Sequence, residues 1–280
     1  MKVSGSLSGS ASILCFAVGA LLGAPAAAQS AQPGWESPKW QFAATIYGYV
    51  PTIDGKVNYN GDLGGSNLHV SMSDVLSHLK MAFMGTFDVH NGRWGLFNDV
   101  FYADLGGVKS RTRDFSIGDI GLPGSTATDL GLDLKTTIWT VAGEYRLASD
   151  PAWTVDLLAG ARMLNLKPTL SYSITGEVGP VGLPSRSGTK AVSASLWDGI
   201  VGVKGRYAFG DDAKWFAPFY LDVGTGQTQL TWQISGGIGY TYNWGSVFAV
   251  WRYLDYNFQS GKALENINMS GPMFGAAFQW

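Results

Sequence analysis

Histidine, serine and aspartate residues near position 70 are the side chains of this chain with the clearest potential for chemistry. His69 and Ser71 are two positions apart, so in a strand both side chains would point to one side, as a base and a nucleophile must. A lipid-cleaving site also needs a carboxylate that orients the histidine, and the whole site must lie where the protein faces the lipid. The pair falls instead in a segment that we expect to be a loop. A hydrolase is therefore the third of our functional hypotheses.

Asp74 and His78 are four residues apart and would share one face of a helix, where they could bind a metal or activate water. Packing explains the same segment more simply. Ser73 can cap a short helix whose apolar residues pack against the mouth or inner wall of a barrel. These residues are Val75, Leu76 and Leu79. We therefore favour packing over catalysis for this segment.

Other catalytic signatures are missing from the sequence. It contains no glycine loop for phosphate, no metal-ligand motif and no pair of carboxylates at a defined spacing. His90 precedes Asn91 and Gly92 and is expected to flank a turn, and 224–226 is expected to be a strand end or turn. We predict a non-enzymatic protein without a metal or cofactor.

Charged residues of both signs occupy alternate positions in several segments. If these segments are strands, their charges point to one face. The charges expected on this inner face are Asp88, Glu144, Arg146, Asp156, Arg162, Asp198, Lys204, Arg206, Asp222 and Arg252. Our preferred interpretation is that these strands form a barrel and that the charges pair with one another across its closed interior, because a lone buried charge is costly. The alternative is a narrow polar pore or a small-ligand site.

Arg252 is the least secure member of this set, because its side of the segment also carries Phe248 and Val250. A β-bulge at this position is the alternative to an inward side chain.

The elements that would hold these residues are strands with a period of two. In 230–244, one parity is apolar and aromatic, as at Trp232 and Ile234, whereas the other is polar, as at Gln233 and Ser235. Such segments are longer than average soluble strands. Ten strands are expected, with eight and twelve as alternatives, near 40–50, 81–90, 93–108, 130–147, 152–172, 188–208, 215–225, 229–243, 246–258 and 267–280.

The connections between these strands alternate between short and long. Tight turns are expected at 91–92, 148–151, 209–214 and 244–245, and long loops at 51–80, 109–129 and 173–187, with an extra hairpin within 54–72. Aromatic residues cluster beside the tight turns, as at Trp94 and Trp153, which is typical of a membrane boundary. These features predict an all-β, antiparallel transmembrane β-barrel with short periplasmic turns and long extracellular loops.

Composition excludes other classes of protein. Only 14% of the residues are charged and 46% are apolar, so the chain is not disordered. The net charge of −2 leaves no excess of positive charge for nucleic acid. No apolar run after residue 28 is long enough for a spanning helix, although a soluble β-sandwich remains a minor alternative.

Residues 1–28 have the order of a secretory signal. Lys2 precedes the apolar run 13–22, which is followed by Pro25 and small residues. As a helix, this run spans about 15 Å, half of a hydrocarbon core, so we expect cleavage before Gln29. The only cysteine, Cys15, would leave with the signal. Residues 29–39 are then a periplasmic leader and 40–280 the barrel.

The last residues carry a resemblance to known proteins. Phe274, Phe278 and Trp280 share one parity, and the segment resembles the terminal β-signal of outer-membrane proteins. Segments at 73–76, 81–85, 92–99 and 251–256 resemble a group of Gram-negative outer-membrane β-barrel proteins that mostly lack an assigned activity. The resemblance covers nearly the whole mature chain. It implies the fold, a place in the bacterial outer membrane and recognition by the barrel-assembly machinery, and it supplies no catalytic residues.

We therefore expect a monomeric outer-membrane barrel in contact with lipid and lipopolysaccharide. Its lumen would be closed or narrow, and it would act structurally or through its loops, whose ligand the sequence does not indicate. A narrow diffusion channel for small polar solutes is the second hypothesis.

Overall fold

Ten long strands form the body of the protein. The computed structural model describes residues 40–58, 65–109, 127–175, 177–178, 181–182, 186–191, 193–210, 212–259 and 264–280. The long strands are β1 Trp40–Tyr49, β4 Leu79–Asn91, β5 Trp94–Lys109, β6 Ala127–Ser149, β7 Trp153–Thr175, β11 Ala194–Phe209, β12 Trp215–Gly226, β13 Leu230–Tyr242, β14 Gly245–Asn257 and β15 Leu264–Gln279. They confirm the ten predicted strands. The predicted signal and leader, residues 1–39, lie outside the described residues.

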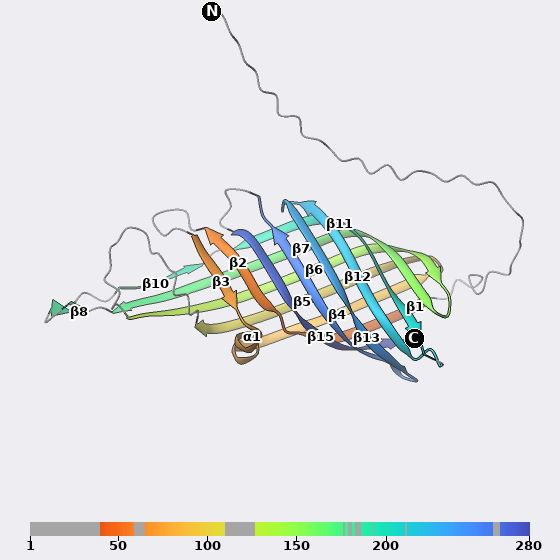
Figure 1. Cartoon of the computed structure of the whole chain (residues 1–280). Coiled ribbons are helices and arrows are strands. Elements are labelled where there is room, and N and C mark those ends of the chain that lie inside the picture. Colours follow the sequence, from red (N-terminus) through yellow and green to blue (C-terminus); the bar gives the residue numbers. More distant parts are fainter. Residues whose placement is uncertain are drawn as a thin grey trace, which may run out of the picture. The chain divides into compact units, whose positions relative to one another are not determined.

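These strands close into an antiparallel barrel (Figure 1). Each pairs with the next in the order given, and β1 also pairs with β15, from Ala43 with Gln279 to Tyr49 with Met273. Short turns join β4 to β5, β6 to β7, β11 to β12 and β13 to β14 at one end, which we call the short-turn end. Gly92 in the first of these turns has a φ of 62°, which glycine adopts without strain. We call the opposite end the long-loop end.

The predicted extra hairpin is present and extends the barrel wall beside β15. Its strands are β2 Thr52–Asn58 and β3 Gly65–Val70, and β2 pairs with the part of β15 that β1 does not reach. Pro51 separates β1 from β2, because it has no N–H for the ladder. Gly271 of β15 faces this break, where a Cβ atom would lie 2.3 Å from the carbonyl oxygen of Val50.

A short helix, α1 Met72–His78, follows the hairpin, but the predicted cap is wrong. Ser71, rather than Ser73, caps it, because its hydroxyl accepts the N–H of Asp74 while the Asp74 carboxylate accepts the N–H of Ser71. Val75 is buried against the barrel interior, whereas Leu76 is exposed. Among the described residues, no helix is long and apolar enough to cross a membrane.

The predicted strand 188–208 is divided in two. β10 Arg186–Ala191 and β11 both pair with β7, one after the other. β8 Glu177–Val178 and β9 Val181–Gly182 form a separate small hairpin. The predicted loop 109–129 falls mostly on residues 110–126, which lie outside the described part of the chain.

The outer face of the barrel is apolar and bounded by aromatic residues. At the short-turn end, rings on neighbouring strands touch, as in Trp94 with Tyr145 and Trp153 with Tyr207. Trp139 and Trp197 form a corresponding pair nearer the other end. Exposed apolar side chains lie between these belts, which is the surface that a bilayer stabilises and water does not. The fold is that of a bacterial outer-membrane β-barrel.

Candidate functional site

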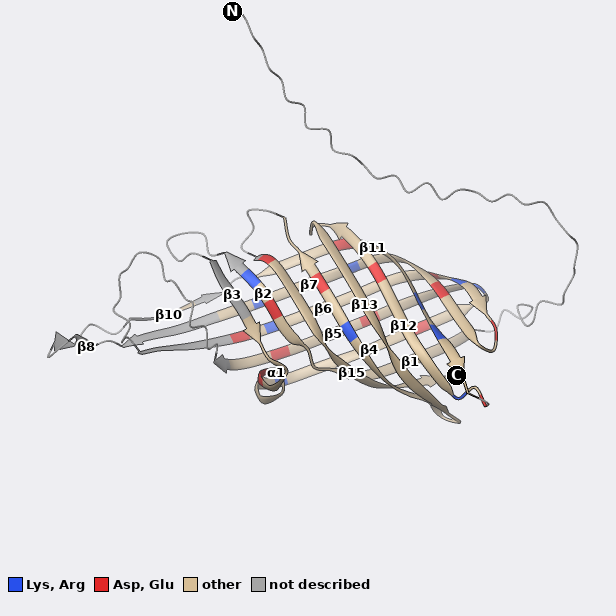
Figure 2. Ribbon diagram, viewed as in Figure 1, with Lys and Arg blue, Asp and Glu red and all other residues tan. Residues whose placement is uncertain are grey.

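All ten charged residues predicted for the inner face have side chains that are buried or half-buried inside the barrel. Figure 2 shows acidic and basic positions interspersed along the strands. Three groups can be distinguished, namely a central layer of arginine pairs, an apolar core toward the long-loop end, and a charged cavity toward the short-turn end.

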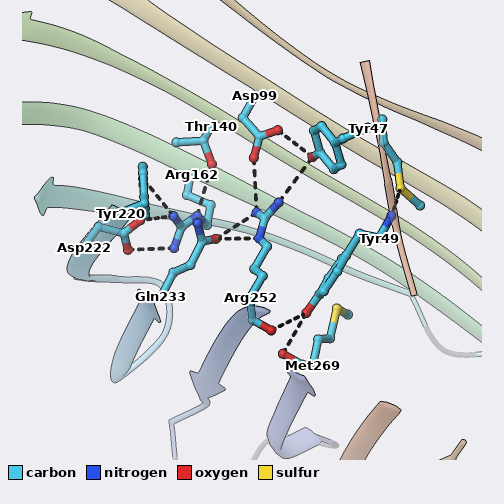
Figure 3. Close-up of polar contacts among 11 residues, drawn as sticks. Tyr47, Tyr49, Asp99, Thr140, Arg162, Tyr220, Asp222, Gln233, Arg252 and Met269 are labelled. Carbon is cyan, nitrogen blue, oxygen red and sulfur yellow. Dashed lines mark hydrogen bonds and ion pairs between the residues drawn. The ribbon is translucent and has the colours of Figure 1, made fainter. Parts of the chain in front are cut away.

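Arg252 is the centre of the first arginine pair (Figure 3). Its guanidinium donates to Asp99 at 3.1 Å, to the hydroxyl of Tyr47 at 3.2 Å and to Gln233 at 2.8 Å. Tyr47 in turn donates to Asp99 at 2.6 Å. Arg252 keeps the strand register with β13 and β15, so the β-bulge alternative is wrong and the inward prediction holds. Sequence reasoning missed Asp99 because its neighbours of the same parity, Phe97 and Phe101, are apolar.

Arg162 forms the second pair with no measurable exposure to solvent. Its guanidinium contacts Asp222 through two nitrogens and donates to Thr140 at 3.1 Å and to Tyr220 at 3.4 Å. Asp198 is the direct neighbour of Arg162 in the register, yet its carboxylate accepts the N–H of Thr228 at 2.8 Å. Bidentate pairs of this kind hold both partners in one fixed geometry.

The long-loop half of the lumen is apolar, which the sequence analysis did not predict. Buried side chains from nine barrel or hairpin elements meet there, and the largest include Leu105, Leu134, Ile138, Leu164, Leu166, Leu254, Tyr256, Ile267 and Met269. Val75 of α1 joins this core. The prediction of a charge-filled lumen is therefore wrong for this half, because the inner face of a narrow barrel can be filled by packed side chains of either kind.

The short-turn half contains a cavity of about 720 Å³. Asp99 and Arg252 of the central layer line its inner end, and Gln41 and Gln279 line it near the start of β1 and the end of β15. Phe216 and other aromatic side chains share the lining with the charges, so the cavity has both polar and apolar walls.

Lys204 connects several charges across this cavity. Its ammonium contacts Asp88 of β4, lies 2.6 Å from Glu144 of β6, and sits 4.4 Å from the centre of the Phe97 ring. Three strands, β5, β6 and β7, separate β4 from β11 on the shorter way round the barrel, so the contact with Asp88 crosses the lumen.

His90 flanks the turn at 92–93 as predicted, and it also belongs to this group. It shares the parity of Asp88, is 5% exposed, and contacts Glu144 through Nε2, with Asp156 at 3.9 Å. Parity could have placed it inside. Asp88, His90 and Glu144 offer ligand atoms within 4.8 Å of one another, as a metal centre would. The ammonium of Lys204 already supplies the positive charge between these carboxylates, so the residues fit an ion-pair network better than a metal site.

Arg146 and Arg206 lie closest to the short-turn end. Arg146 is the register partner of Asp156 and donates to it at 2.8 Å and 3.3 Å. Arg206 lies with its guanidinium carbon 5.5 Å from the centre of the Phe216 ring. The structure thus brings nine of the ten predicted charges into two linked layers, with Asp198 beside them.

Each side chain considered for catalysis makes a polar contact with a nearby residue. Nδ1 of His69 lies 2.5 Å from Asp54, so the histidine does have a carboxylate partner. The hydroxyl of Ser71 instead contacts Ser73 at 2.8 Å and Asp74 at 2.6 Å. His78 contacts the carbonyl oxygen of Asp74 at 2.9 Å, within one turn of α1. The pKa of Asp74 is held below its usual value because Ser71 donates hydrogen bonds to the carboxylate.

The last strand presents its three predicted signal residues outward. Phe274, Phe278 and Trp280 are all exposed on the outer face. Backbone hydrogen bonds join Phe42 and Trp280 in both directions, so the two ends of the barrel segment meet. Their recognition by the assembly machinery stays a prediction.

Comparison with known proteins shows similarity only in structure. No protein-family model matches the chain. No curated protein sequence matches it. The outer-membrane protease OmpT of Escherichia coli is 10% identical, with 88% of this chain and 99% of that chain covered and a TM-score of 0.48. The attachment invasion locus protein Ail of Yersinia pestis is 13% identical, with 86% of this chain and 98% of that chain covered and a TM-score of 0.32. The translocator domain of the autotransporter NalP of Neisseria meningitidis is 11% identical, with 86% of this chain and 89% of that chain covered and a TM-score of 0.37.

Proposed function

We propose that this chain is a non-enzymatic outer-membrane barrel with a closed lumen, acting structurally or through its surface loops. The observation that carries the proposal is the buried central layer of Arg162 and Arg252 with their acidic partners. A guanidinium and a carboxylate that are both withdrawn from water hold one another strongly, because separating them would leave two unpaired buried charges.

The position of these pairs supports closure. Arg252 on β14 reaches Asp99 on β5, and β15, β1 and β4 lie between these strands on the shorter way round. The pair therefore crosses most of the lumen, as the contact between Lys204 and Asp88 does nearer the short-turn end. Beyond Arg252, the apolar core fills the long-loop half, so an ion would have to pass both a fixed charge layer and an apolar layer.

Single-channel recording tests this proposal against the diffusion channel. The mature chain would be refolded, its folding verified by heat-modifiable gel migration, and the protein inserted into a planar bilayer. We expect no discrete conductance steps from the wild-type protein. Discrete steps from the wild type would overturn the proposal. A step conductance that rises when Arg162 is replaced by a shorter residue, but not when the exposed Lys135 is replaced, would establish a pore.

A lipid substrate assay addresses the hydrolase hypothesis in the same samples. We expect no cleavage of lipopolysaccharide or phospholipid acyl esters. Cleavage that disappears in Ser71→Ala would overturn the non-enzymatic assignment.

A further inference from the structure

Arg206 differs from the other cations inside the barrel. The remaining four each contact a carboxylate, and these are Arg146, Arg162, Lys204 and Arg252. Within the described part of the chain, Arg206 has no ion pair and no side-chain hydrogen bond. Its register neighbours are Thr154 and Pro218, and the charge that acts on it is that of Arg146, which has the same sign. This corner of the cavity therefore holds positive charge that no acidic side chain neutralises.

The ring of Phe216 fixes how Arg206 can bind. The guanidinium carbon lies 5.5 Å from the centre of this buried ring, so the aromatic face occupies one face of the guanidinium. The N–H groups along its edge are left without partners from the described residues. A guanidinium edge is a planar fork that matches the two oxygens of a carboxylate or phosphate.

The cavity around Arg206 is of a size and composition suited to a small ligand. Its volume of about 720 Å³ falls in the ordinary range of small-molecule pockets. Polar groups near Arg206 come from Gln41, Arg146 and Thr154, whereas Phe216 and Phe248 supply an apolar wall. Such a pocket suits a molecule with one charged end and one apolar part.

We propose that this cavity binds a small organic anion, whose carboxylate or phosphate group is held by Arg206 and whose apolar part lies against Phe216 and Phe248. The ligand enters from the short-turn end, because the central arginine layer closes the other side. The direction of entry rests on the closed lumen proposed above, whereas binding itself does not.

Isothermal titration calorimetry of the mature protein in lipid nanodiscs tests the proposal, with benzoate as the probe and empty nanodiscs as the blank. We expect saturable binding of benzoate to the wild type and at least tenfold weaker binding to Arg206→Gln, because the variant loses the charge-assisted hydrogen bonds to the anion (about 1.4 kcal/mol per tenfold). Benzyl alcohol, the uncharged analogue, should not distinguish the two proteins.

Lys214→Gln is the matched control. It removes the same charge at the same end of the barrel, but Lys214 is exposed, pairs with Asp212 and does not line the cavity. We expect wild-type affinity for benzoate. Arg206→Lys, which keeps the charge without the planar fork, should fall between the wild type and Arg206→Gln, and it provides the test if Arg206→Gln does not fold.

Phe248→Ala separates the apolar contact from the charge. It should weaken benzoate several-fold and leave inorganic phosphate unchanged. Absence of benzoate binding to the folded wild type, or equal affinities of Arg206→Gln and Lys214→Gln, would overturn the proposal. Neither result alters the conductance measurement, so the closed lumen and the anion site can fail separately.

Discussion

In the long-loop half of the barrel, the inner face is packed with leucine, isoleucine, methionine and tyrosine, whereas in the short-turn half it carries charges around a cavity. Most of the long strands, among them β1, β4, β5, β7, β14 and β15, line both halves, with the same alternation of side chains. The comparison teaches that the period of a strand determines which residues face inward, while the filling of the lumen depends on how the inward side chains from different strands fit together.

Breaking the ion pairs of the central layer should cause the largest loss in the free energy of unfolding. Arg162→Met leaves Asp222 buried without its ion-pair partner, and we expect a loss of about 3–5 kcal/mol in the free energy of unfolding. The double variant Arg162→Met/Asp222→Leu should recover most of this loss. Urea unfolding from lipid vesicles, followed by tryptophan fluorescence, measures both. Arg206→Met is the matched control and should cost less, because no buried carboxylate loses its partner.

A cavity-creating substitution in the apolar half should cause the next largest loss in the free energy of unfolding. Leu164 is fully buried, so Leu164→Ala should lower the free energy of unfolding by about 2–5 kcal/mol. Leu157→Ala removes the same atoms from the same strand on the outer face, where the side chain is 43% exposed, and it should cost clearly less. Equal losses in the two variants would contradict a packed core in this half.

Water access should distinguish the halves directly. The chain after Cys15 contains no cysteine, so single cysteines can be introduced without background into a protein that comprises residues 29–280. Ser235→Cys lines the cavity and Ile267→Cys lies in the apolar core. We expect a charged methanethiosulfonate reagent to modify the first at least ten times faster, because the second is excluded from water (about 1.4 kcal/mol per tenfold). Similar rates would indicate a continuous aqueous path.

The smallest expected effect concerns α1, which closes the apolar half at Val75. Ser71→Ala removes the cap and should destabilise the helix by about 1 kcal/mol. Because the pKa of Asp74 is lowered in the folded state, its contribution is present at neutral pH and is lost as the pH falls through that lowered value. Amide hydrogen exchange of residues 72–78 at pH 7 and at acid pH measures both. Unchanged exchange in Ser71→Ala would show that packing alone holds the helix.

Much of the fold could be predicted from the sequence, because alternation over ten or more residues is a strong signal. The inward positions of Asp156 and Arg162 follow directly from it. The contribution of Asp99 did not follow, because its strand has an apolar inner face and the charge that Asp99 pairs with, Arg252, is 153 residues away. The place of His90 in the ion-pair network did not follow either, because a local turn signal was given more weight than its parity.

The strand pairing also determines when the barrel can form. The last strand, β15, pairs with both β1 and β2, so segments more than 200 residues apart in the chain must meet. Contacts over such separations are slow to form, because a long loop must close first. The wall therefore cannot be completed until β15 has been synthesised, and the edges of β1 and β15 remain open to other chains until they pair. Closure at Phe42 and Trp280 is the event that ends this exposure.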